Sequence, residues 1–271
     1  MRIRAGFIDC KGGKLYYRTA GEGPALVLLH AGLVDSRMWD SQFSVFAREY
    51  QVLCYDLRGC GHSTLPESPF SPTEDLKFLL DYLEVERAGL IGLSLGGGIA
   101  IDFALAHASR VNALILANPS LGGFQYSEEL AQIGAALYLT GKTRGPRAAL
   151  EILLSEDFWS YAIPLKSHPE ARRKFIRLVK DNPQIFLWDP ALIQSLDPPA
   201  VDRLDEIEVP TLLVASQNDL SANRDIIDRL QAHIPNSSRA TIAECSHMVN
   251  LDQPERFNRC ILDFLRRSRV D

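Results

Sequence analysis

The sequence predicts an α/β fold, a doubly wound and mostly parallel central sheet of about eight strands with a helical lid insertion. Apolar runs of strand length alternate with helix-length segments whose apolar residues fall on one face. This alternation stops between about Pro119 and Pro210 and then resumes. A chain of 271 residues with 46% hydrophobic content can bury one large core, and it is long enough for an enzyme.

The first part of the chain predicts strands and helices in regular succession. The stretch "ALVLLH" is a continuous apolar run, which is typical of a strand buried at the centre of a parallel sheet. A helix starting near Pro72 places Leu76, Leu79, Leu80 and Leu83 on one face. The strands expected here cover 2–10, 14–21, 25–30, 51–57, 88–93 and 111–119, and the helices cover 37–48, 72–83 and 95–107.

The middle of the chain, residues 121–203, offers helix-like segments only, such as "SEELAQIGAALYLTG" and "PEARRKFIRLVKDN", interrupted by prolines. We therefore expect a core formed by 1–120 and 204–271, with 121–203 inserted as a helical cap, or lid. The alternation returns with a strand over 209–219, a helix over 223–232, a strand over 238–244 and a helix over 254–267.

Composition argues against several classes of function. Lys and Arg number 29 against 34 Asp and Glu, a net charge of -5 without long runs of like charge, so neither nucleic acid nor a membrane surface is an expected partner. The N-terminal stretch lacks the apolar core of a signal peptide, and we expect a cytoplasmic protein. Five widely spaced cysteines without a C-x-x-C pair predict neither a disulfide framework nor a zinc site. No metal or organic cofactor is expected, and the oligomeric state is left open.

The stretch "LIGLSLGGG" places Ser94 between Gly92 and Gly96, after a buried strand and before a helix. This G-x-S-x-G pattern is typical of a nucleophile elbow, a sharp strand-to-helix turn that tolerates only small residues two positions either side of the nucleophile. The alternative, a phosphate-binding loop, lacks both G-K-[ST] and G-x-G-x-x-G. Ser94 is therefore the candidate nucleophile.

A serine nucleophile needs a base, and the base needs an acid that orients it. Asp219 ends one predicted strand and His247 follows the next, so both are expected at the carboxyl edge of the sheet, in the order Ser, Asp, His. His62 is a weaker candidate base because it precedes Ser94 in the chain. Asp252 is interpreted as a helix N-cap, and Asn118 has no carboxylate.

These motifs, with "LVLLHAGLVDSRMW", "YDLRGCGHS" and "CSHMVNLDQPERF", resemble the α/β-hydrolase fold superfamily along essentially the whole chain outside the insertion. The resemblance implies an oxyanion hole formed by the N–H of Leu95 and, as first donor, that of Gly32. Ala31 stands where the family usually has glycine, so Ala31 and Leu33 stay open as donors, and His30 is expected to brace the loop. Relatives that dehalogenate or open epoxides use an aspartate nucleophile, and Ser94 favours acyl chemistry instead.

The resulting hypothesis is a serine hydrolase that cleaves a small, largely apolar carboxylic ester or lactone through an acyl-enzyme. Alternatives are hydrolysis of a carbon-carbon bond in a vinylogous diketone and a slow-turnover small-molecule receptor of the same fold. The insertion is rich in aromatic residues that suit an apolar pocket. Candidate pocket residues are Phe124, Trp159, Trp188 and Met248.

Overall fold

The computed structural model describes residues 2–155 and 160–268, and its centre is a sheet of eight strands in the order β1-β2-β4-β3-β5-β6-β7-β8. The two hairpin strands β1 and β2 pair antiparallel with each other, β2 pairs antiparallel with β4, and every later pairing is parallel. The strands are β1 (Arg4–Cys10), β2 (Gly13–Ala20), β3 (Ala25–Leu29), β4 (Gln51–Tyr55), β5 (Ala88–Leu93), β6 (Val111–Ala117), β7 (Thr211–Ser216) and β8 (Ser237–Ile242).

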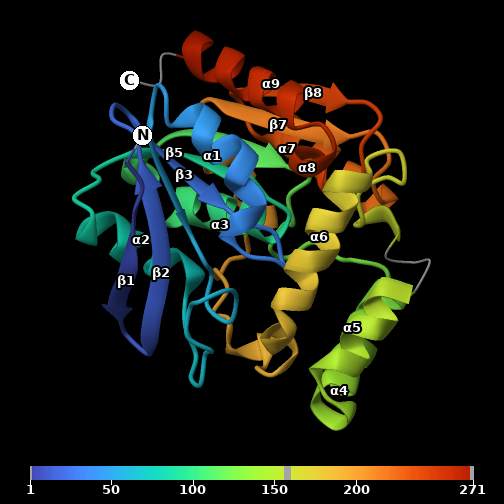
Figure 1. The fold of residues 1–271 in the computed structure, drawn as a ribbon. Coiled ribbons are helices and arrows are strands. Elements are labelled where there is room, and N and C mark those ends of the chain that lie inside the picture. Colours follow the sequence, from blue (N-terminus) through green and yellow to red (C-terminus); the bar gives the residue numbers. More distant parts are fainter. Residues whose placement is uncertain (1, 156–159, 269–271) are drawn as a thin grey trace.

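Helices cover both faces of this sheet, as Figure 1 shows. Alternate residues of one strand belong to different cores: Leu26 and Leu28 pack with α1 and α9, whereas Val27 and Leu29 pack with α2, α3 and α7. Both faces are apolar because a doubly wound sheet is buried on both sides. The core helices are η1 (Ser36–Trp39), α1 (Asp40–Phe46), α2 (Pro72–Tyr82), α3 (Leu95–Ala106), η2 (Ala108–Arg110), η7 (Leu204–Glu206), α7 (Ser221–His233), α8 (Val249–Asp252) and α9 (Pro254–Arg267).

The 121–203 segment runs between β6 and β7, and its described part consists of helices joined by loops, with one parallel β-bridge from Ile193 to Phe70. Figure 1 shows α4 and α5 packed side by side away from the β1-β2 hairpin, with α6 between them and the core. The helices are α4 (Glu128–Arg144), α5 (Pro146–Ser155), α6 (Pro169–Asp181), η4 (Pro183–Phe186), η5 (Pro190–Leu192) and η6 (Ala200–Asp202). Among the helices of the described residues, none is long and apolar enough to cross a membrane.

Three local expectations change. The helix expected over 37–48 is a short 3-10 helix followed by α1, which ends at Phe46. The strand expected over 209–219 begins after Pro210, which has no N–H for the ladder, and ends at Ser216, so Asp219 lies in the following loop. The N-cap assigned to Asp252 is wrong, because Gln253 precedes α9 and Asp252 is the last residue of α8.

Candidate active site

Ser94 sits on a strained turn between β5 and α3. Its φ of 54° and ψ of -117° lie in a region that residues with side chains rarely adopt. A Cβ on Gly96 would lie 2.2 Å from the Leu29 carbonyl oxygen, and one on Gly92 would lie 2.3 Å from that of Gly96. The turn can therefore form only with glycine on both sides, and it leaves Ser94 half-buried at the N-terminus of α3.

Asp219 and His247 form a buried pair beside this turn. His247 Nδ1 lies 2.8 Å from Asp219 Oδ2, and the other carboxylate oxygen accepts from the backbone N–H of Leu220 (2.8 Å) and the side-chain amide of Asn223 (2.7 Å). Because the carboxylate can only accept, Nδ1 carries the imidazole proton in a neutral His247, and Nε2 is left with a lone pair. A histidine oriented in this way can act as a base through Nε2.

The backbone of His247 is fixed from two sides. Its N–H donates to the Tyr161 carbonyl (3.0 Å), and its carbonyl accepts from the side-chain amide of Asn118 (2.8 Å) at the end of β6. Asp252 holds the preceding residue by accepting from the Ser246 N–H (2.7 Å). These bonds tie the histidine loop to the sheet, so the ring position does not depend on the Asp219 contact alone.

Ser94 and His247 line one cavity of about 360 Å³, and Asp219 lies behind the histidine. None of the cavity's lining residues in the described part of the chain is a lysine or an arginine. The other residues of this Ser94 cavity are Ser120, Tyr126, Leu130, Ala131, Gly134, Tyr161, Leu220 and Asn223.

The loop after β3 approaches the first turn of α3. A Cβ on Gly32 would lie 3.9 Å from Leu95 Cδ2, so Gly32 is adjacent to the residue that follows Ser94. The N–H of Ala31 already donates to the Met38 sulfur (3.2 Å), which leaves Gly32 and Leu33 as the donors available in this loop. Leu95 begins α3, where the first N–H groups have no partner within the helix.

A sequence profile described as the alpha/beta hydrolase family matches residues 26–259, which include the turn, the acid and the histidine. This chain belongs to the alpha/beta hydrolase family. A 2-hydroxy-6-oxononadienedioate/2-hydroxy-6-oxononatrienedioate hydrolase of Pseudomonas putida is 32% identical over 97% of this chain and 94% of its own length. Carboxylesterase YbfK of Bacillus subtilis is 25% identical, over 96% of this chain and 86% of its own. The enol-lactonase from Burkholderia xenovorans LB400 superposes with a TM-score of 0.80 at 25% identity, covering 96% of this chain and all of that one.

In this alpha/beta hydrolase, His30 holds the Gly32 loop from inside. Its Nε2 accepts from the Leu57 N–H (2.9 Å), so the proton is on Nδ1, which donates to the Ala31 carbonyl (2.7 Å). Complete burial lowers the pKa of His30 and keeps the ring neutral. His30 therefore connects the loop after β3 to the loop after β4.

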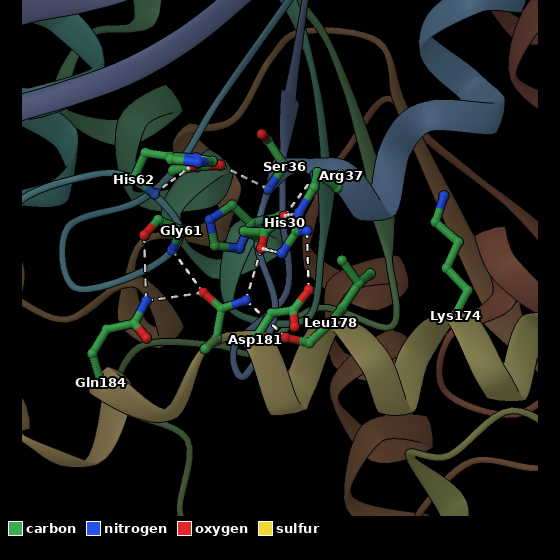
Figure 2. Close-up of polar contacts among 12 residues, drawn as sticks. His30, Ser36, Arg37, Gly61, His62, Lys174, Leu178, Asp181 and Gln184 are labelled. Atoms are coloured by element: carbon green, nitrogen blue, oxygen red, sulfur yellow. Dashed lines mark hydrogen bonds and ion pairs between the residues drawn. The ribbon is translucent and has the colours of Figure 1, made fainter.

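A second set of contacts connects the same loop to α6 in the 121–203 segment, and Figure 2 shows how Arg37 reaches both sides. Arg37 binds Asp35 (2.7 Å) and Asp181 at the end of α6 (3.0 Å), while Asn182 donates to Asp35 (2.7 Å) and accepts from the Gly61 N–H (2.7 Å). Burial raises the pKa of Asp35, but the hydrogen bonds from Arg37 and Asn182 outweigh it and bring that pKa to about 2.

Three of the four predicted pocket residues do not line the Ser94 cavity. Trp188 lines a different cavity, Phe124 packs against Tyr126 (ring centroids 5.2 Å apart), and Met248 is buried in the core. Trp159 lies outside the described residues. The aromatic residues of the 121–203 segment that line the Ser94 cavity are instead Tyr126 and Tyr161. Their positions depend on how the segment packs, which spacing along the chain does not reveal.

Sequence reasoning missed Asn223, which donates to Asp219 and lies 3.2 Å from His247 Nδ1. Its spacing of four residues from Asp219 was the available signal, because the chain turns into α7 between them. In the described residues, no group of three or more His, Cys, Asp or Glu side chains is placed to hold a metal ion.

Proposed function

We propose that this alpha/beta hydrolase is a serine hydrolase that cleaves a small, largely apolar carboxylic ester or lactone through an acyl-enzyme. One observation carries the proposal: a serine on a strained elbow shares a cavity with a histidine whose Nδ1 is 2.8 Å from a buried carboxylate. The fold's carboxylesterase and enol-lactonase relatives support it.

In the proposed mechanism, His247 Nε2 takes the hydroxyl proton as Ser94 Oγ attacks the substrate carbonyl carbon. Asp219 holds the Nδ1 proton and stabilises the imidazolium that forms. The N–H groups of Leu95 and Gly32 bind the oxyanion of the tetrahedral intermediate. His247 then protonates the leaving alkoxide, the ester bond breaks, and water repeats the attack on the acyl-enzyme with His247 again as base.

The charge around the Ser94 cavity favours a neutral substrate. The described lining residues include neither lysine nor arginine, so a substrate carboxylate placed there would lose its hydration without gaining an ion pair. A neutral ester or lactone meets no such penalty. The 121–203 segment, which supplies Tyr126 and Tyr161 to this cavity, acts in this proposal as a cap that excludes water from the acyl-enzyme.

Hydrolysis of a carbon-carbon bond in a vinylogous diketone is the second candidate. The relative at 32% identity, named as a hydrolase of a dienedioate, favours it. Binding such a dicarboxylate is favoured by positive charge near its carboxylates, and the lack of a described cation in the Ser94 cavity places ester hydrolysis first. Comparing rates on a neutral p-nitrophenyl ester and on a dienedioate at equal concentration distinguishes the two.

The experiment that tests the proposal measures hydrolysis of a panel of p-nitrophenyl esters and lactones by the wild type and by Ser94→Ala, with a fluorophosphonate probe as label. We expect turnover and labelling in the wild type, and loss of both in Ser94→Ala. Labelling without turnover on any ester, lactone or dienedioate would favour a receptor. Turnover that survives in Ser94→Ala would overturn the assignment of the nucleophile.

A further inference from the structure

A second cavity, of about 200 Å³, lies next to the Ser94 cavity and shares Ser120 and Tyr126 with it. Its walls come from the ends of β4 and β6, from α2 and α3, and from residues 188 and 193–196 of the 121–203 segment. Ser120 and Tyr126 therefore form a wall common to the two cavities.

One face of α3 leads from the nucleophile into the second cavity. Leu95, Gly98, Ile99 and Asp102 all line it, and their spacing of three and four residues places them on a single helical face. Asp102 is eight residues beyond Ser94, which corresponds to about 12 Å along the helix axis. Asp102 thus lies on the same helical face, at the end away from the elbow.

Polar atoms without partners concentrate around this cavity. Among the described residues, six buried side-chain nitrogen or oxygen atoms lack a hydrogen bond. Three of the six belong to residues that line the second cavity: Asp102 Oδ1, Tyr55 Oη and Trp188 Nε1. Trp188 Nε1 packs against Gly59, so the unpaired Asp102 oxygen and Tyr55 hydroxyl are the better placed of the three. Buried polar atoms normally have a partner, so these two groups are available to hydrogen-bond a ligand.

The charges of the residues that line the second cavity limit the charge and the hydrogen-bonding groups of a ligand bound there. Arg58 and Asp75 neutralise each other in a two-point ion pair (2.6 and 2.7 Å), which leaves Asp102 as the uncompensated charge among the cavity's described residues. Burial raises the pKa of Asp102 to about 6, partly opposed by Arg203, so the group is an anion above that pH. An anionic ligand end would be repelled, and an ammonium would not accept from the indole or phenol donor.

We propose that the second cavity binds the acyl chain and selects medium-length acyl groups with a terminal hydroxyl. The hydroxyl donates to the Asp102 carboxylate and accepts from a donor on the cavity wall, Trp188 or Tyr55. Aliphatic carbons of the chain pack against Leu95 and Ile99 on the way. This specificity rests on the proposed esterase function and adds the substrate class to it.

The test compares kcat/KM for two p-nitrophenyl esters, octanoate and ω-hydroxyoctanoate, in the wild type, Asp102→Leu and Asp102→Asn. The readout is the ratio of the hydroxylated to the plain ester within each protein, which is insensitive to changes in the amount of active enzyme. We expect a ratio on the order of ten in the wild type, because a hydrogen bond to a buried charged group contributes roughly one factor of ten or more. The ratio should fall to about one or below in Asp102→Leu and recover in part in Asp102→Asn, which retains an acceptor.

Two controls make the result specific. Asp225→Asn removes an exposed carboxylate on α7 and should leave the wild-type ratio unchanged. The isomeric ester with its hydroxyl on the β carbon cannot reach Asp102 and should show no advantage over octanoate.

A wild-type ratio near one, or a preference that persists in Asp102→Leu, overturns the proposed specificity. If the wild type then still hydrolyses p-nitrophenyl acetate and Ser94→Ala does not, the proposed esterase function stands and only the second-cavity proposal fails. If no ester is hydrolysed at all, both fail.

Discussion

At the scale of single residues, a few buried hydrogen bonds organise the candidate site and fix the tautomer of His247. Asp219 uses one oxygen for His247 and the other for Leu220 and Asn223, so the carboxylate is held in one orientation. That orientation selects the His247 tautomer with the proton on Nδ1. Asparagine at position 219 would have the same size as aspartate, but its amide can point an N–H at His247 Nδ1. That contact would favour the opposite tautomer, with the proton on Nε2.

Asp219→Asn should therefore lower kcat for ester hydrolysis on the order of 10³-fold or more while changing KM little. The measurement is steady-state kinetics on p-nitrophenyl acetate at pH 8, with Asp225→Asn on the neighbouring helix as the matched control. A loss of less than about tenfold would contradict the assignment of Asp219 as the acid that orients His247.

Asp102 gives a pH-dependent prediction for stability. Its folded pKa of about 6 lies above the ordinary value of 3.8, so the folded state binds a proton more tightly than the unfolded state. Stability of the wild type should fall as pH rises from about 4 to 6 through this group, and Asp102→Asn removes the effect. Urea unfolding should find the variant more stable than wild type at pH 8, on the order of 2 kcal/mol, with the gap closing towards pH 4. A gap that is independent of pH would contradict this.

At the scale of elements, the β5-α3 turn requires glycine at two positions. In Gly96→Ala, the new methyl group would overlap the Leu29 carbonyl at the end of β3, so the helix or the strand must shift. We expect this variant to lose several kcal/mol of unfolding free energy, as strained overpacked sites do, and most of the hydrolase activity proposed for Ser94.

Gly134→Ala is the matched control for stability, because a Cβ at this α4 position meets nothing within 4 Å. Alanine has the higher helix propensity, so this variant should be unchanged or stabilised by up to about 1 kcal/mol. Thermal unfolding followed by circular dichroism measures both variants. Equal melting temperatures for the two would contradict the steric argument.

Asp35 and Arg37 join the Gly32 loop to the end of α6, so their contacts couple two elements far apart in the chain. Figure 2 shows Arg37 and Asp181 in this network. The folded pKa of about 2 lies below the ordinary 3.8, so the stabilisation by the Asp35 carboxylate is present above about pH 4 and is lost as pH falls through 2. Asp35→Asn should cost about 2 kcal/mol at pH 7 in urea unfolding, and less at pH 3. Asp181→Asn, at the exposed end of the same network, should cost under about 1 kcal/mol. Equal losses of unfolding free energy in the two variants would contradict the larger stabilisation assigned to the buried Asp35 carboxylate.

At the scale of the whole molecule, the parallel strands collect the site at one edge of the sheet. Ser94 follows β5, Asp219 follows β7 and His247 follows β8, and all three turns lie at the carboxyl ends of their strands. The chain's net charge is -5, and the described lining of the Ser94 cavity includes no lysine or arginine. Neither the net charge nor the described lining of this cavity favours the approach of an anionic substrate.

It follows that kcat/KM for a neutral p-nitrophenyl ester should vary less than about twofold between low salt and roughly 0.5 M NaCl, because there is no long-range attraction to screen. Initial rates at fixed pH across that series measure it. The same series on a dianionic dienedioate is the comparison, because salt screens attraction only for a charged substrate. A steep decline there would show that positive charge guides the anion and would favour the dicarboxylate alternative.

The sequence predicted the alternation of strands and helices, and with it the sheet and the positions of Ser94, Asp219 and His247 at one edge, because these follow from local patterns. Apolar runs identify buried strands, glycines flanking Ser94 identify the turn, and the loops that follow parallel strands lie at the carboxyl edge. The profile match over 26–259 agrees with that reading of the fold.

Only the tertiary structure decided which side chains surround the serine. Phe124, Trp188 and Met248 are residues of the kind that lines an apolar pocket, yet Tyr126 and Tyr161 are the ones that line the Ser94 cavity. The packing of the 121–203 segment on the core decides which of them reach it. The amide of Asn223 beside Asp219, the occupied N–H of Ala31 and the unpaired atoms around Asp102 likewise depend on contacts between distant segments. Local spacing fixes which face of an element a residue occupies, whereas partners across the fold are set by the packing of all elements together.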